Sequence, residues 1–166
     1  MNNKLYDLYK FDKLQEMCEQ SDLHMIQLSG FRLKIKGEKI RIKELLGRLL
    51  FKIQTMGKAE IWYVLKDEKI VHKSVCIPYC KKFSFMAKGD FEIGPCVTLQ
   101  SFRGQGIYPK VISAIVKSHL KEKKCDFYML VNAENISSIK GIEKAGFKKI
   151  GQVEQYGVLK QYRRIS

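Results

Sequence analysis

The stretch Phe102–Ile112, FRGQGIYPKVI, combines residue types whose spacing suits the binding of an anion. Arg103 precedes Gly104 and Gly106, and Pro109 opens an apolar run with helical spacing. Glycines permit positive φ and let the backbone approach a ligand closely. The unpaired N–H groups at a helix start attract anions, and an arginine side chain can bind a phosphate through two hydrogen bonds. The stretch therefore predicts a pyrophosphate site where a strand runs into a helix.

Two familiar phosphate loops do not fit this stretch. A P-loop needs Gly-x4-Gly-Lys-Ser/Thr, and the dinucleotide-binding fingerprint needs a third glycine, and neither is present. A single Gly-x-Gly before a helix is most often only a structural turn. A second signal is therefore needed before the stretch can be assigned a function.

The elements that must position this stretch follow from the patterning around it. Residues 59–65 (AEIWYVL) and 69–77 (KIVHKSVCI) predict two strands joined by a hairpin turn, and residues 80–90 predict a loop. Residues 91–99 (FEIGPCVTL) predict a strand that Gly94 and Pro95 interrupt with a bulge or a splay. A helix that starts near Pro109 follows, because proline is tolerated in a first turn.

The C-terminal third alternates strand and helix patterns. Residues 126–131 predict a strand, and residues 135–147 (NISSIKGIEKAGF) predict a helix with an apolar stripe of Ile136, Ile139 and Ile142 and a cap at Gly146. Residues 147–153 and 157–165 predict two closing strands. At the other end of the chain, residues 5–18 and 41–53 predict helices, and residues 31–42 predict a hairpin or edge strands. This order predicts an α/β domain with a mixed sheet.

Two separate motifs resemble signatures of the GNAT superfamily of N-acetyltransferases. The RGQGI stretch resembles the family motif Q/R-x-x-G-x-G/A, in which Arg103 and Gly106 match and Tyr108 stands at the last Gly/Ala position. About 30 residues later, NISSIKGIEKAGF resembles the second family signature. The matching residues there are Asn135, Ser138, Glu143, Lys144, Gly146 and Phe147. The resemblance covers roughly residues 60–164.

The resemblance implies a fold and an acetyl-CoA site. It implies one GNAT-like domain over residues 1–166, with a variable, helical acceptor-side part (1–57) and an acetyl-CoA-binding core (58–166). The implied sheet is mixed, mostly antiparallel and splayed at its central strand, with helices on its flanks. The backbone at Val97, Thr98 and Leu99 would pair with pantetheine. The remaining cofactor contacts implied are Arg103, Gly104, Gln105, Gly106, Ile107, Tyr108, Asn135 and Ser138.

The implied chemistry is attack of an amine on the thioester, which needs a base and an acid. Glu92 is the candidate base because family members carry a catalytic Glu on this strand; an exposed Glu without a role is the alternative. Many family members have an acidic Tyr at the position of Ile142, so that role is vacant here. Ser138 is a weak candidate acid, and Tyr108, although close to the predicted site, is read as a packed aromatic. Water is the remaining proton source.

Two other side chains have a chemical interpretation beside a plainer one. Cys96 could serve a two-step enzyme, but a buried strand cysteine is usually inert. His72 could face the acceptor, but a lone strand histidine is more often only half-buried.

Composition and charge set limits on location and partners. The chain has 166 residues, 45% of them hydrophobic, and a net charge of +14. It has no apolar run long enough to span a bilayer and no secretory signal, so we expect a cytoplasmic protein without a membrane partner. Five cysteines without close pairing, together with three histidines, predict free thiols and no metal site. The positive charge favours an anionic ligand.

These observations lead to one favoured function and two alternatives. The favoured function is acetyl-CoA-dependent transfer of an acetyl group to a primary amine on a small, anionic acceptor. The motifs are similar to those of GNAT members from bacterial polysaccharide clusters, which implies an amino sugar or a nucleotide-linked amino sugar as acceptor. A protein or peptide N-terminus and a non-catalytic basic binding module are the alternatives. No RNA-binding aromatic pattern supports a nucleic-acid partner, and a homodimer is left open.

Overall fold

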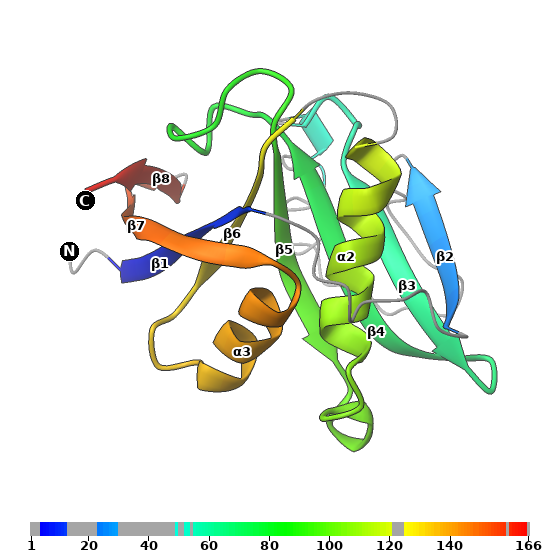
Figure 1. Cartoon of the computed structure of the whole chain (residues 1–166). Helices are drawn as coiled ribbons and strands as arrows, with labels where there is room; N and C mark the ends of the chain where they lie inside the picture. The colour runs from blue at the N-terminus through cyan, green and yellow to red at the C-terminus, as the bar shows by residue number, and fades with distance from the viewer. Residues whose placement is uncertain are drawn as a thin grey trace.

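A single mixed sheet with two flanking helices organises the part of the chain that the computed structural model describes. That part comprises residues 4–12, 23–29, 49, 52–53, 55–120, 125–158 and 160–165. The strands lie side by side in the order β2-β3-β4-β5-β6-β1-β7-β8 (Figure 1). The α/β fold class predicted from the sequence is therefore confirmed.

The bounds of the strands show which segments of the chain meet in the sheet. They are β1 Lys4–Phe11, β2 His24–Ser29, β3 Glu60–Lys66, β4 Lys69–Pro78, β5 Phe91–Thr98, β6 Phe127–Val131, β7 Phe147–Tyr156 and β8 Gln161–Arg164. Among the strands that the structure describes, only β5 and β6 pair in parallel, and every other neighbouring pair of strands is antiparallel. The sheet is mixed and mostly antiparallel, as predicted.

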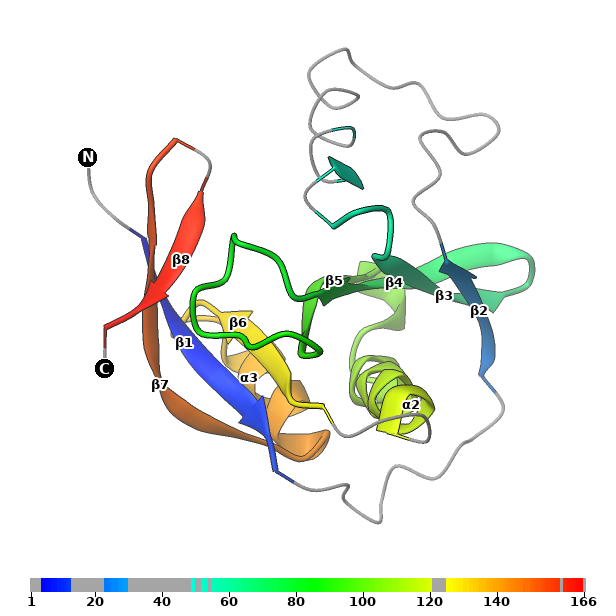
Figure 2. The ribbon, with the colours of Figure 1, turned by 90° about the horizontal axis from the view of Figure 1, so that it is seen from above.

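Two helices, α2 (Ile107–Leu120) and α3 (Ile136–Lys144), lie on the same side of the sheet. Figure 2 shows them on one side and the loop between β4 and β5 on the other. The helices cover a core that includes Val111, Ile112 and Ile115 of α2. The loop covers a second cluster, to which it contributes Phe83 and Met86. Both faces of the sheet are therefore covered at the start of β5, where Phe91, Glu92 and Ile93 are buried.

Local sequence explains the turns that frame the site. Asp67 and Glu68 both adopt positive φ, of 48° and 59°, in the two-residue turn between β3 and β4, which is the geometry that matches the twist of a hairpin. Asn135 caps α3 by accepting a hydrogen bond from the Ser138 amide. Gly146, with φ of 91°, ends that helix and lets β7 begin at Phe147. The hairpin turn and the end of the helix at Gly146 were predicted correctly, whereas the cap by Asn135 was not predicted.

The predicted helix over residues 5–18 is wrong where the structure describes it. Residues 4–11 form β1, which lies between β6 and β7. Asp7, Leu8 and Tyr9 are all buried, because a strand in the middle of a covered sheet is enclosed on both faces. Consecutive buried residues break the alternation expected of a strand, and Leu5, Leu8 and Tyr9 then imitate a helical stripe.

Two other predictions for the N-terminal third fall largely outside the described residues. The predicted hairpin over 31–42 lies outside them, and so does most of the predicted helix over 41–53, of which residues 49, 52 and 53 are helical. The proposed division at residue 57 stays a prediction. β1 nevertheless belongs to the same sheet as the strands of the 58–166 core.

None of the described helices is both long enough and apolar enough to cross a membrane.

We predict that β1 holds the second half of the sheet together. Leu8 is completely buried, whereas Leu5 of the same strand is 54% exposed. Leu8→Ala leaves a cavity, and we expect it to lower the free energy of unfolding by about 2–5 kcal/mol. Leu5→Ala is the matched control, with an expected change below about 0.5 kcal/mol. Urea unfolding measures both, and equal losses in the two variants would contradict a central place for β1.

Candidate functional site

A pocket of about 490 Å³ opens where β5 ends and α2 and α3 begin. Cys96, Val97 and Thr98 of β5 form one wall. The glycine loop and the first turn of α2 form the second wall, and the N-terminal part of α3 forms the third. The pocket therefore joins the two segments whose motifs were recognised in the sequence.

Most of the predicted cofactor residues line this pocket. They are Val97, Thr98, Arg103, Gly104, Gly106, Ile107, Tyr108, Asn135 and Ser138. Leu99 and Gln105 do not line it. Leu99 is 48% exposed, and the Gln105 side chain accepts a hydrogen bond of 3.0 Å from Lys66 Nζ. The sequence reasoning missed Phe102, Lys140, Gly141 and Lys144, which also line the pocket.

The glycine loop has the backbone geometry of an anion site. Gly104 and Gly106 have φ of 76° and 72°, in the region that residues with a Cβ rarely adopt. The loop leads directly into the N-terminus of α2, whose first amides have no partner within the helix. Arg103, Lys140 and Lys144 add positive charge to the same pocket. The pocket can thus receive a multiply charged anion such as a pyrophosphate.

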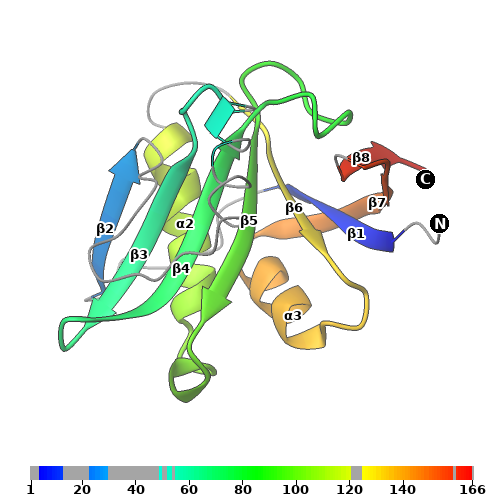
Figure 3. The same ribbon diagram turned by 180° about the vertical axis from the view of Figure 1, so that it is seen from behind.

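The central strands separate beside this loop, as the sequence predicted. β5 pairs with β6 only at Phe91–Phe127 and Glu92–Tyr128. Figure 3 shows the two strands close together at one end and far apart at the other. Beyond Glu92, no described strand pairs with the edge of β5 that faces β6. That edge offers backbone donors and acceptors to an extended ligand.

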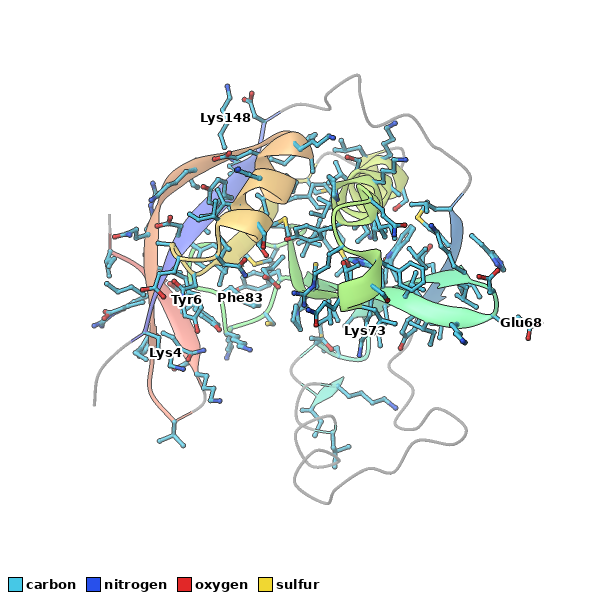
Figure 4. The ribbon with its side chains drawn as sticks, turned by 90° about the horizontal axis from the view of Figure 1, so that it is seen from below. Lys4, Tyr6, Glu68, Lys73, Phe83 and Lys148 are labelled. Carbon is cyan, nitrogen blue, oxygen red and sulfur yellow. The ribbon has the colours of Figure 1, made fainter. Side chains whose placement is uncertain are left out.

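Figure 4 looks at the two halves of the separated sheet from below, with Lys73 on β4 in one half and Tyr6 on β1 in the other. Tyr6 and Phe83 lie near each other there, and both rings contact Tyr162, with centroids 5.7 and 5.5 Å from its ring. Lys82 lies over the rings of Phe83 and Tyr162. These aromatic contacts fix the loop between β4 and β5 over the half-sheet that carries β1, β7 and β8.

Glu92 is buried on β5 at the point where the strands separate, and it is only 5% exposed. Burial raises the pKa of Glu92 to about 8, although the charge of Lys82 lowers it slightly. An added Cβ on Gly94 would lie 2.7 Å from Glu92 Oε1, so the carboxyl group occupies the space that a side chain at residue 94 would need. A pKa near the pH at which an enzyme works is the range that favours general base catalysis. The alternative that Glu92 is exposed is wrong, and its role as the base stays a prediction.

The α3 residues have mixed outcomes. Ile142 is 1% exposed and belongs to the core, whereas Ile136 is 56% exposed and lies outside it. The predicted stripe is therefore wrong at Ile136, which sits in the first turn, where the helix leaves the core. Ser138 lines the pocket, but its amide is used in the cap made by Asn135.

Tyr108 and Gly141 form a close contact between the two helices. A Cβ on Gly141 would lie 2.5 Å from Tyr108 Cδ1. The absence of a side chain within α3 thus makes room for the Tyr108 ring at the pocket. Tyr108, which stands at the last Gly/Ala position of the motif that this stretch resembles, therefore packs its ring against Gly141. Burial raises the pKa of the Tyr108 phenol.

Glu143 of the second motif has a structural contact in the described part of the chain. Tyr9 on β1 donates a hydrogen bond of 3.3 Å to Glu143 Oε1. The motif therefore ties α3 to the strand that the sequence reasoning misassigned.

A possible metal-ligand cluster lies near the other end of α2. Glu60, Cys76 and His119 each have one ligand atom within 4.8 Å of the others. The Glu60 carboxylate already accepts hydrogen bonds from His119 (3.1 Å), Trp62 (3.2 Å) and Gln27 (3.0 Å). Burial opposes ionisation of Glu60, but these bonds lower its pKa overall. The contact between His119 and Glu60 is an ion pair that links α2 to β3. The expectation that the protein has no metal site stays a prediction.

None of the cysteines that the structure describes, Cys76, Cys80, Cys96 and Cys125, forms a disulfide bond. Cys18 lies outside the described residues. Burial raises the pKa of Cys76 well above its usual value and also raises that of Cys80, so both thiols are protonated at neutral pH.

Comparison with solved structures shows which known fold this architecture resembles. The chain superposes on a GNAT-family acetyltransferase from Colwellia psychrerythraea with a TM-score of 0.62, 18% identity and 92% of this chain covered. It superposes on a GCN5-related N-acetyltransferase-like protein from Streptococcus suis with a TM-score of 0.54, 14% identity and 98% of this chain covered. The chain has the GNAT fold.

Sequence comparison adds no closer relative to this GNAT fold. No protein-family model matches the chain, and no curated protein matches it significantly. A further structural match, a functionally unknown conserved protein from Staphylococcus epidermidis, has a TM-score of 0.61 and 13% identity, with 91% of this chain covered. The chain spans 55%, 62% and 60% of the length of the Colwellia, Streptococcus and Staphylococcus structures, respectively.

We predict that Glu92 costs stability at alkaline pH. The ordinary pKa of a glutamate is 4.5, and burial in the folded protein raises the pKa of Glu92 to about 8, so the folded state binds more protons between these values. The free energy of unfolding therefore falls as pH rises from 4.5 to 8. Glu92→Gln removes the charge, and we expect it to be more stable than wild type by roughly 3–5 kcal/mol above pH 8.

Urea unfolding at about pH 5 and about pH 9 checks this expectation, because only the alkaline measurement should show the gain. Glu134→Gln, at an exposed carboxylate, is the matched control. An equal difference between wild type and Glu92→Gln at both pH values would show that Glu92 is not held neutral by burial.

Proposed function

We propose that this protein is an acetyl-CoA-dependent N-acetyltransferase that acts on a primary amine. The observation that carries the proposal is the meeting, in one pocket, of an unpaired strand edge and a glycine loop at a helix N-terminus. An extended amide such as pantetheine can pair with the unpaired strand edge, and a pyrophosphate can bind at the glycine loop. CoA carries both groups in one molecule. The similarity to GNAT-family structures also supports acetyl-CoA as the donor.

The donor would lie along β5 and across the loop. The backbone at Val97 and Thr98 would bind the pantetheine amides, and the loop from Arg103 to Tyr108 would bind the pyrophosphate. Lys140 and Lys144 would attract the remaining phosphate charge. Leu99 and Gln105 do not line the pocket, so neither is assigned a contact with the donor.

Glu92 would accept a proton from the attacking amine. Its pKa of about 8 lies near the pH at which the enzyme must work. Part of the protein then carries an ionised Glu92, and this carboxylate is basic enough to accept a proton. Removal of the proton leaves an uncharged amine that attacks the thioester carbonyl. The acetyl carbon then loses the CoA sulfur, which departs as a thiolate and must gain a proton.

The acceptor proposed is a small anionic amine, specifically an amino sugar or a nucleotide-linked amino sugar. The net charge of +14 supports an anionic acceptor as well as the anionic donor. A screen that measures free CoA thiol in the presence of amino sugars, nucleotide-linked amino sugars and peptide N-termini would identify the acceptor. Faster thiol release with a peptide than with every amino sugar would overturn this part of the proposal.

We predict that Gly106→Val abolishes binding of acetyl-CoA. Valine disfavours the positive φ of 72° at this residue and places a side chain where the pyrophosphate would lie. We expect the affinity to fall by at least about 10²-fold in isothermal titration calorimetry, which corresponds to about 2.7 kcal/mol.

Gly157→Val provides the matched control for backbone strain. Gly157 has φ of 69° in the turn between β7 and β8, away from the pocket. Its variant should bear a similar strain and bind acetyl-CoA as wild type does. Unchanged affinity in a folded Gly106→Val protein would refute the assignment of the loop.

We predict that turnover rises with pH through the pKa of Glu92. The turnover number should increase with a midpoint near pH 8 in wild type. Glu92→Gln should lower it by roughly 10²-fold and leave the affinity for acetyl-CoA within a few-fold. Steady-state kinetics of thiol release across this pH range provides the measurement. A Glu92→Gln protein that keeps both the rate and the pH midpoint would assign proton removal to another group.

A further inference from the structure

Four side chains of β4 and β5 form a continuous hydrogen-bonded chain beside the pocket. Thr98 Oγ1 lies 2.7 Å from His72 Nδ1, and His72 Nε2 lies 2.8 Å from Ser74 Oγ. Ser74 Oγ donates to Cys96 Sγ at 3.1 Å. The register of the two strands produces the chain, because His72 is opposite Thr98 and Ser74 is opposite Cys96. Both ends of the chain, Thr98 and Cys96, line the pocket.

The three hydrogen bonds between these four side chains all run in the same donor-to-acceptor direction. Ser74 has a single hydroxyl hydrogen and gives it to Cys96, so His72 Nε2 must donate to Ser74. Burial lowers the pKa of His72 to about 4, so the ring is neutral at neutral pH and carries only that one N–H. His72 Nδ1 therefore accepts from the Thr98 hydroxyl. Every hydrogen in the chain points toward the sulfur of Cys96.

Cys96 Sγ accepts a second hydrogen bond, from the backbone N–H of Val75. Two donors aimed at one sulfur stabilise the thiolate form, whereas burial opposes it more strongly and raises the pKa of Cys96 to about 12. The thiol is thus protonated at neutral pH. Because its sulfur is the acceptor in both bonds, its own S–H hydrogen is available to the pocket that the residue lines.

We propose that Cys96 is the acid that protonates the CoA sulfur as the acetyl group leaves it, with Ser74 and His72 as positioning residues. The inference rests on the proposed function. The bond between the acetyl carbon and the CoA sulfur breaks, its electron pair stays on the sulfur, and the sulfur takes the proton of Cys96. The Cys96 thiolate keeps its hydrogen bonds from Ser74 and Val75. It regains a proton from water after CoA has left, while Glu92 returns the amine proton to water.

Chemical similarity makes this transfer feasible. The donor and the acceptor of the proton are both alkyl thiols, and burial in the same pocket raises the pKa of both. The two hydrogen bonds to Cys96 then favour the transfer. The acid comes from the β5 wall of the pocket, whereas Ile142, at the α3 position where the resembled family often has a Tyr, is buried in the core and does not line the pocket. Cys96 therefore accounts for an acid function that the motif comparison left vacant.

The test measures release of CoA thiol from acetyl-CoA with hydroxylamine as the acceptor. Hydroxylamine is uncharged at neutral pH and needs no base, so the experiment reports the acid step without Glu92. Cys96→Ala should lower the turnover number by roughly 10²-fold with little change in the affinity for acetyl-CoA. Imidazolium added in increasing concentration should restore part of the lost rate, because a small acid can enter the vacated space. Ser74→Ala should show a smaller loss, and Cys125→Ala, a thiol outside the pocket, should match wild type.

The outcomes separate this inference from the proposed function. If wild type binds acetyl-CoA and releases thiol but Cys96→Ala is equally fast, the acid role of Cys96 is overturned and the acetyltransferase proposal stands. A Tyr108→Phe protein that alone shows the loss and the rescue would assign the acid to Tyr108 instead. An acetyl group found on Cys96 by mass spectrometry, without an acceptor, would make the residue a nucleophile and would also overturn the inference. A wild type that binds no acetyl-CoA, or that binds it and releases no thiol with any amine, would overturn both.

Discussion

The separation of β5 from β6 after two residue pairs is the constraint on which the rest of the site depends. It exposes one backbone edge of β5 to a ligand while the other edge stays paired with β4. The same strand places Glu92 at the branch point and Cys96 and Thr98 along the pocket wall. Gly94 lies between them and leaves the space that the Glu92 carboxyl group fills. A single strand thus supplies the surface for the proposed donor, the proposed base and the proposed acid.

The two halves of the sheet can diverge because each half is stabilised separately. In one half, α2 packs on β4 and β5, and the ion pair between His119 and Glu60 ties its end to β3. In the other half, β1 lies between β6 and β7, and Tyr9 of β1 holds Glu143 of α3. The Tyr108 ring against Gly141 connects the two helices at the pocket. The geometry of the pocket therefore depends on residues from both ends of the chain.

Local signals predicted the parts of the structure that local chemistry determines. The β3–β4 hairpin, the glycine loop before α2 and the cap at Gly146 could be predicted because each depends on a few neighbouring residues. β1 could not, because its partners are more than 100 residues away in sequence and cover both of its faces. The row of hydrogen bonds that links Thr98 to Cys96 through His72 and Ser74 depends on the register between β4 and β5, which the strand patterns do not specify. Lys140 and Lys144 were missed as pocket residues because lysines on a helix usually face solvent. The sequence does not show that β5 and the glycine loop lie opposite them.

The central claim is that the loop and the open edge of β5 bind one CoA molecule together. A crystal structure of the protein with CoA tests this claim most directly. The account predicts the pyrophosphate within hydrogen-bond distance of the loop amides between Gly104 and Tyr108. It also predicts the pantetheine beside Val97 and Thr98, and the sulfur next to Cys96. CoA bound elsewhere, or a pyrophosphate at the loop with the pantetheine directed away from β5, would contradict it.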